Sequence, residues 1–204
     1  MEVADRILEG ARELFFSYGI RSVSMDDIAR HLGMSKKTVY QNFKDKDEIV
    51  NMLLVASLES NEKQLKKLET DSKDAVQEII LIMKHIAEMF SRINPNLFYD
   101  MQKYYPEAWK TFQAFKQRSM IKMVETNLQQ GISQGYFRND INVRILAKMR
   151  IEQVEMAMNP MIFSHDKFNI AEVQLCMIDH FLHGITTLKG HKLLNKYKNI
   201  NEDE

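Results

Sequence analysis

Residues 24–43 contain two short segments that can each form a helix, joined by the turn Gly-Met-Ser. Each segment begins with a serine, a residue that suits a helix N-cap. Ala29 is small where two crossing helices would touch, Gly33 follows where the turn needs a positive φ, and Val39 then points into the shared core. This spacing predicts a helix-turn-helix.

The outward face of the second segment is polar. Lysine can reach guanine acceptors in the major groove of DNA, and glutamine or asparagine can pair with adenine. The whole chain has 28 basic and 28 acidic residues, but residues 36–46 hold four lysines against one aspartate. A solvated lysine-rich helix is the alternative interpretation, and the turn spacing favours double-stranded DNA. The residues left on this face are Lys36, Lys37, Thr38, Gln41 and Asn42.

Helix-breaking residues are scarce, with three prolines and seven glycines among 204 residues. Apolar residues recur at helical spacing, and Asp45 with Glu48 forms a capping-box pattern at the start of a long helix. The chain is therefore predicted to be all-α. The expected helices cover about residues 3–18, 25–32, 36–43, 45–68, 75–93, 97–104, 106–134, 141–158 and 169–190.

Several function classes are disfavoured by the sequence. The lone Cys176 excludes an internal disulfide framework and is expected to be an inert core thiol. The acidic, amphipathic N-terminus does not resemble a signal peptide, and no apolar run approaches the ~20 residues of a membrane span. A cytoplasmic protein without membrane contact is expected. Enzyme and cofactor motifs are not found. His180 and His183 have a spacing that can bind a metal, but structural histidines are favoured, so no metal or cofactor is predicted.

Residues 3–50 resemble the N-terminal domain of TetR-family transcriptional regulators, most specifically in "TVYQNFKDKDEI". The rest of the chain is similar only in helix layout and in "QGISQGYFRNDIN". The resemblance implies that the five polar residues of the outward face approach bases, and that Ser24, Tyr40 and Lys46 contact phosphates. It also implies a DNA-binding domain over residues 1–48, a helical effector-binding and dimerisation domain over 49–195, and a polar tail over 196–204.

The helix expected at 141–158 has a narrow charged strip formed by Arg144, Lys148, Glu152 and Glu155. Its remaining surface is largely apolar, so burial on two sides is expected. Two such helices from each of two chains can form a four-helix dimer interface. A helix central to its own monomer is the alternative. The predicted interface residues are Met149, Val154, Met177, Ile178, Phe181 and Ile185.

Aromatic residues and methionines are dense between residues 83 and 123 and predict a ligand pocket, with ordinary core packing as the alternative. The expected effector is an apolar or amphipathic small molecule whose polar end faces Asp100, Glu107 or Glu152. The predicted lining residues are Met83, Phe90, Phe98, Tyr104, Trp109, Phe112, Met123 and Glu152.

The function predicted from these features is a ligand-responsive repressor that binds a pseudo-palindromic operator as a homodimer. Two other classes remain open at this point. One is an architectural DNA-binding dimer without an effector, and the other is an all-α enzyme.

Overall fold

The computed structural model describes residues 2–94 and 96–200, and helices form its scaffold. The all-α prediction is confirmed, because the only extended pairing in these ranges is an isolated bridge between Phe137 and Thr186. The elements are α1 (Val3–Tyr18), α2 (Met25–His31), α3 (Lys36–Asn42), α4 (Lys46–Asp71), α5 (Ala75–Phe90), α6 (Leu97–Tyr104), α7 (Pro106–Phe115), the π-helical segment η1 (Lys116–Met120), α8 (Ile121–Ser133), α9 (Val143–Ala157), α10 (Ile170–Ile185) and α11 (Leu188–Lys198).

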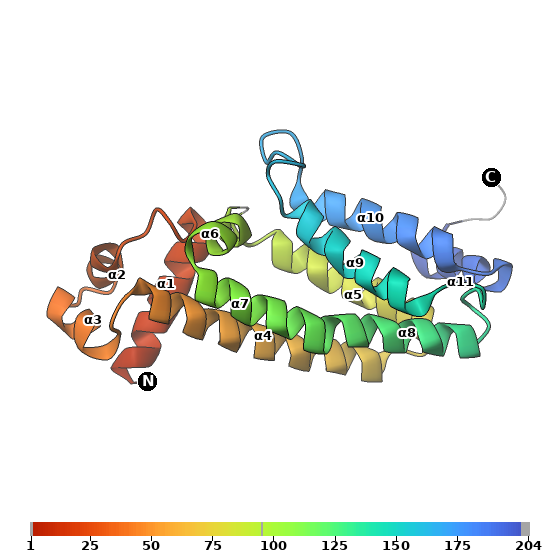
Figure 1. Cartoon of the computed structure of the whole chain (residues 1–204), viewed down its shortest axis with the longest axis horizontal. Helices are drawn as coiled ribbons and strands as arrows, with labels where there is room; N and C mark the ends of the chain where they lie inside the picture. The colour runs from red at the N-terminus through yellow and green to blue at the C-terminus, as the bar shows by residue number, and fades with distance from the viewer. Residues whose placement is uncertain (1, 95, 201–204) are drawn as a thin grey trace.

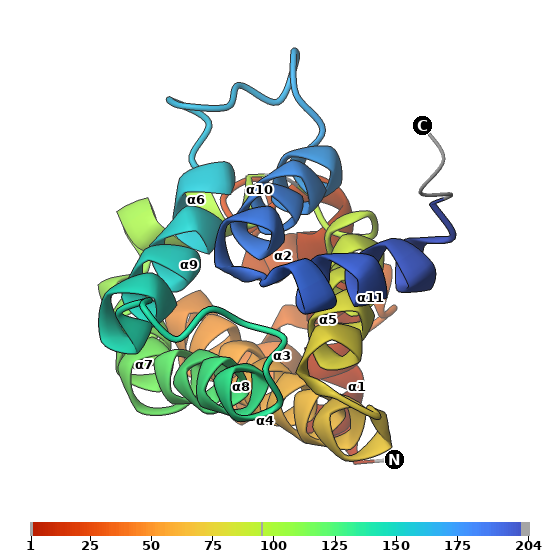
Figure 2. The ribbon, with the colours of Figure 1, turned by 90° about the vertical axis from the view of Figure 1, so that its right-hand side faces the viewer.

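The three N-terminal helices gather at one end of an elongated molecule (Figure 1). From that end α4 runs along the body beside α7, and α8 continues in the direction of α7. On the other side of the body α9 lies next to α10, and the loop that joins them projects outward (Figure 2). No helix within residues 2–94 and 96–200 is long and apolar enough to cross a membrane.

One hydrophobic core joins the N-terminal helices to the body. Ile7, Phe15 and Val39 belong to the same buried cluster as Met101 and Phe112 of α6 and α7. A second cluster packs α5 against α8, α10 and α11. The first cluster therefore packs α1 and α3 together with α6 and α7.

The helix predicted over 106–134 is continuous but contains the wider η1 turn. Lys116 opens this turn and is buried, and its ammonium donates to Glu152 at 3.1 Å and also to Glu155. Burial opposes the charge of Lys116, but the two carboxylates outweigh that effect and raise its pKa. The interruption therefore lies where a buried cation ties the α7–α8 helix to α9.

The prediction of one helix over 169–190 is wrong, because α10 ends at Ile185 and α11 begins at Leu188. The hydroxyl of Thr187 caps α11 by accepting from Gly190 N–H at 3.1 Å. Part of the region predicted as a polar tail is helical, since α11 continues to Lys198 and buries Leu194. Residues 201–204 of that tail lie outside the described residues.

Helix starts follow the predicted caps with one difference. The Asp45 side chain accepts from Glu48 N–H at 2.9 Å, as a cap should. The Glu48 side chain does not complete the box at Asp45, because it accepts from Lys44 N–H at 2.7 Å instead. The α5 helix ends at Phe90, three residues earlier than expected.

Candidate DNA-binding face and internal cavity

The turn between α2 and α3 has the geometry that the sequence predicted. Gly33 has a φ of 63°, and Met34 N–H donates to Ala29 O at 2.9 Å. The Ser35 hydroxyl accepts from Thr38 N–H at 3.0 Å and caps α3. Val39 is fully buried against α1 and α2, so one side of α3 is fixed and the other is presented outward.

The structure brings most of the predicted DNA-contacting side chains together on the exposed side of α3. Thr38 is half-buried, and its hydroxyl lies 2.8 Å from that of Ser35. Asn42 donates back to Thr38 O at 2.8 Å and would exchange this bond for a base contact. The exposed members of the set are Lys36, Lys37, Tyr40, Gln41 and Asn42.

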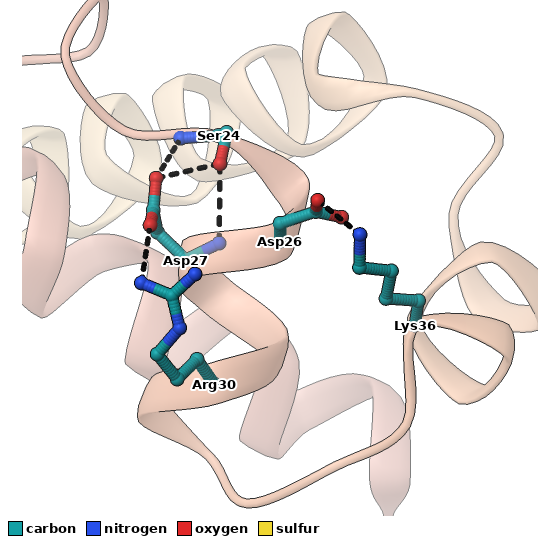
Figure 3. Close-up of polar contacts among 5 residues, drawn as sticks. All are labelled: Ser24, Asp26, Asp27, Arg30 and Lys36. Atoms are coloured by element: carbon teal, nitrogen blue, oxygen red, sulfur yellow. Dashed lines mark hydrogen bonds and ion pairs between the residues drawn. The ribbon is translucent and has the colours of Figure 1, made fainter.

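The start of α2 is a capping box in which Ser24 and Asp27 bind each other (Figure 3). Asp27 Oδ2 accepts from Ser24 N–H at 2.9 Å and from its hydroxyl at 2.5 Å. These hydrogen bonds lower the pKa of Asp27, and the Arg30 guanidinium, 3.3 Å from its other oxygen, adds to the effect. Ser24 is therefore occupied as a cap in the free protein. A phosphate contact by its hydroxyl would compete with Asp27.

Lys46 does not lie with the outward-facing residues, although a phosphate contact was predicted for it. Its ammonium points inward and donates to Ile20 O at 3.0 Å and to Val23 O at 2.7 Å. Burial lowers the pKa of Lys46, and its nitrogen lies 5.6 Å from the centre of the Tyr105 ring. Lys46 therefore fixes the segment between α1 and α2 to the body of the molecule.

An apolar cavity of about 600 Å³ lies inside the body. This volume is within the ~300–1,000 Å³ range of small-molecule sites. Phe15, Phe16 and Ile20 of the N-terminal helical unit contribute to its wall, together with residues of α4 to α10. Four of the predicted lining residues are among them, namely Phe90, Phe98, Phe112 and Met123.

The other four predicted lining residues do not line this cavity. Met83 packs against the second core cluster, and Tyr104 lies on the surface beneath the Arg21 guanidinium at 4.9 Å. Trp109 and Glu152 instead border a separate hollow of about 540 Å³ between α6 and α9. Glu152 is bound there by Lys148 at 2.6 Å and by Lys116 at 3.1 Å, so it is not available to a ligand head group.

Three polar residues of the cavity wall were not singled out from the sequence. Arg150 of α9 is buried, and so are Glu78 of α5 and Asn127 of α8. Asn127 donates to Glu78 at 2.7 Å, and burial raises the pKa of the Glu78 carboxyl. The sequence did carry a signal for Arg150. It lies three residues after Ala147 and four before Val154, so a helix places it on the same apolar face as these two residues.

Residues 7–53 match the model of the family described as bacterial regulatory proteins, tetR family. An uncharacterized HTH-type transcriptional regulator of Bacillus subtilis, YvaF, is 26% identical over 168 residues, which is 81% of this chain and 86% of that protein. An HTH-type transcriptional regulator of Staphylococcus aureus is 34% identical over 71 residues, or 35% of this chain and 38% of that protein. Residues 7–53 therefore form a TetR-family DNA-binding domain.

Solved structures of TetR-family and related regulators share the fold. A TetR-family regulator from Agrobacterium tumefaciens superposes with a TM-score of 0.74 at 21% identity and covers 90% of this chain and 97% of its own. FadR from Bacillus subtilis, solved in complex with stearoyl-CoA, gives a TM-score of 0.66 at 16% identity and covers 89% and 98%. The tetR-family match and the HTH-type relatives make this chain a DNA-binding transcriptional regulator.

The regulator's α9 and α10 do not present the face that was predicted for dimerisation. Ile178, Phe181 and Ile185 are buried within their own subunit, and Val154 lines the cavity. Of the predicted set, only Met149 is exposed, while Met177 is half-buried. Cys176 is also exposed, which corrects its expected place in the core. The exposed apolar residues of these two helices are Ile145, Met149, Met156 and Leu175.

Asp26 offers a test of the DNA-binding face, because it forms an ion pair with Lys36 of the regulator's α3 (Figure 3). Asp26→Asn should free Lys36 and remove a negative charge near the phosphates. A contact between two exposed charges in water is worth about 1 kcal/mol, so affinity for a random-sequence duplex should rise about fivefold in low salt. Fluorescence anisotropy titrations at several salt concentrations would measure this gain, which should shrink as salt rises.

Asp71→Asn is the matched control, because Asp71 is exposed at the end of α4 remote from α3. It should change affinity little. An unchanged affinity for Asp26→Asn, or an equal gain in both variants, would place the Asp26–Lys36 pair away from the DNA.

Proposed function

We propose that this regulator is a ligand-responsive repressor that binds a pseudo-palindromic operator as a homodimer. The observation that carries the proposal is the cavity wall, which includes Phe15, Phe16 and Ile20 from the DNA-binding end as well as the helices of the body. A ligand in this cavity touches α1 directly. Repression requires only that the operator be occupied, and the exposed face of α3 supplies that contact.

Coupling from the cavity to the DNA-binding face runs through a short polar junction. The end of α1 is held by Asn94, whose N–H donates to Phe16 O at 2.7 Å. Asp100 of α6 is buried and accepts from Arg21 N–H at 2.9 Å. Leu97, Phe98 and Met101 on the same short helix line the cavity. A ligand that moves α6 therefore also moves the segment that leads into α2.

The homodimer proposal rests on the exposed apolar face of α9 and α10. Ile145, Met149 and Met156 follow one another along α9 at helical spacing, and Leu175 lies on the neighbouring α10. A two-fold interface brings the same patch from both subunits together, so the apolar residues of each subunit are buried by those of the other. Two α3 helices held in this way suit an operator whose half-sites are related by two-fold symmetry.

A small-molecule effector is supported by the cavity, which an architectural dimer does not need. The regulator of similar fold that was solved with stearoyl-CoA shows that this fold accommodates an amphipathic acyl ligand in that protein. Regulation of a chromosome also places the proposed site of action in the cytoplasm.

Selection of bound sequences from a random duplex library, followed by footprinting, tests the proposal. The expected site is a pseudo-palindrome whose half-sites are one or more helical turns apart, roughly 10 base pairs or a multiple of that. A promoter carrying the site should be silenced by the regulator, and a cavity ligand should restore expression. Protection without sequence preference would favour the architectural alternative, and increased expression would indicate activation.

A further inference from the structure

The cavity contains a buried cation that has no protein counter-charge. Arg150 has 5% of its surface exposed and lines the cavity from α9. Within residues 2–94 and 96–200 its guanidinium has no ion pair or hydrogen bond, and its Nη1 atom is buried without an acceptor. Buried charged groups are ordinarily paired. The unpaired guanidinium therefore indicates a partner that the protein itself does not supply.

The surroundings of Arg150 define the rest of that partner. The cavity wall near it on α9 and α10 is apolar and includes Ile151, Met158 and Ile178. The two other arginines of the wall, Arg12 and Arg92, are exposed to solvent, and Arg12 is paired with Glu9 at 2.5 Å. The interior thus combines one unpaired positive group with a large apolar surface.

We propose that the cavity binds an amphipathic carboxylate, with its head group paired to Arg150 and its apolar body lying among the side chains of α4, α5 and α8. The planar guanidinium can donate two parallel hydrogen bonds to one carboxylate. This inference rests on the proposed effector cavity and names the chemical class of its ligand. It also corrects the expectation that the ligand head would face Asp100, Glu107 or Glu152.

A single negative charge fits the cavity better than two. Among the described residues that line the cavity, Arg150 is the one buried cation, and Glu78 contributes an acidic group to the same wall. Glu78 receives only the Asn127 amide at 2.7 Å. A dianionic head, such as a phosphate monoester, would bring a second negative charge into this low-dielectric interior without a cation to balance it.

Calorimetric titration with matched amphiphiles tests the proposal. The probes are octanoate and dodecanoate, the corresponding alcohols, and the corresponding alkyltrimethylammonium ions, all below their micellar concentrations. Dodecanoate should bind the wild-type regulator more tightly than dodecanol. A charge-assisted hydrogen-bonded pair is worth about 1.5–3 kcal/mol, so Arg150→Met should weaken dodecanoate binding by roughly 10- to 100-fold.

Two further variants keep the result interpretable. Arg144→Met makes the same change at an exposed position of α9 and should leave both affinities within about twofold. Arg150→Lys retains the charge and should keep a preference for the carboxylate over the alcohol. Dodecanol binding should change little in Arg150→Met, which shows that the cavity keeps its shape.

Several outcomes would overturn the proposal. The first is that wild type and Arg150→Met bind dodecanoate with equal affinity. The second is that the wild type binds the alcohol or the cation as tightly as dodecanoate, or more tightly. The third is that none of the probes binds. Failure of the repressor proposal is a separate result. In that case dodecanoate binds through Arg150, but operator affinity is the same with and without it.

Discussion

Phe181→Glu is expected to unfold the regulator rather than to dissociate it. Phe181 is 4% exposed and packs with Ile178 and Leu182 in the core beside α5. The substitution removes the ring from a packed apolar cluster and buries a carboxylate in its place, which costs several kcal/mol out of a total stability of about 5–15 kcal/mol. Circular dichroism should show loss of helix or a strongly lowered Tm. A folded monomer from this variant would instead return Phe181 to the subunit interface.

Ile145→Glu is the complementary change and should yield a folded monomer. Ile145 is 63% exposed in the subunit, so the charge costs little within one chain. In a two-fold dimer the same substitution appears twice at the contact. Light scattering should then report the monomer mass, and operator affinity should fall by about 100-fold or more because the half-sites are bound separately.

Met161→Glu provides the control for this experiment. Met161 is 84% exposed on the loop between α9 and α10. Its substitution, like that of Ile145, replaces an apolar side chain by a carboxylate. It should remain dimeric with unchanged operator affinity. If Ile145→Glu also stays dimeric, the interface lies on another face of the molecule.

The helix-turn-helix was predictable because its determinants are contiguous in the sequence. Ala29, Gly33 and Val39 act within one short stretch, and the serine caps lie at the helix starts that they specify. The break between α10 and α11 was not predictable in this way, since neither proline nor glycine marks it. It is fixed by a distant contact, in which Thr187 N–H donates to Tyr136 O at 2.9 Å.

Periodicity identified the apolar faces of α9 and α10 but not the surfaces that cover them. Phe181 and Ile185 satisfy the pattern of an interface helix equally well whether α5 or a second subunit buries them. The same limit applies to the cavity. An aromatic residue on a helix gives no sign of which internal space it borders. Phe115 lines the cavity, Trp109 borders the hollow between α6 and α9, and Phe98 borders both.

Charged residues were the least predictable part of the site, because their ordinary place is the surface. Lys46 was expected at a phosphate, and its ammonium binds two carbonyl oxygens of its own chain. Lys116 and Arg150 are both buried, but only Lys116 has carboxylates beside it. That difference separates a structural cation from one that is available to a ligand.

Arg150→Met is expected to stabilise the ligand-free regulator. Burial lowers the pKa of Arg150 to about 10, so the group remains charged at neutral pH and destabilises the fold. A shift of this size corresponds to a penalty on the order of 3 kcal/mol. Because the folded-state pKa is the lower one, the penalty is fully present at pH 7 and is lost only as the pH rises above about 10.

Thermal unfolding at pH 7 without ligand should therefore show a Tm for Arg150→Met that is roughly 5–10 °C above wild type, with Arg144→Met as the unchanged control. Dodecanoate at saturating concentration should narrow this difference in Tm, because its tighter binding to wild type offsets most of the penalty on the buried guanidinium. A lowered Tm for ligand-free Arg150→Met would show that the guanidinium stabilises the cavity wall on its own. The expected narrowing of the difference in Tm by dodecanoate would instead tie the destabilising charge of Arg150 to the binding of an anion.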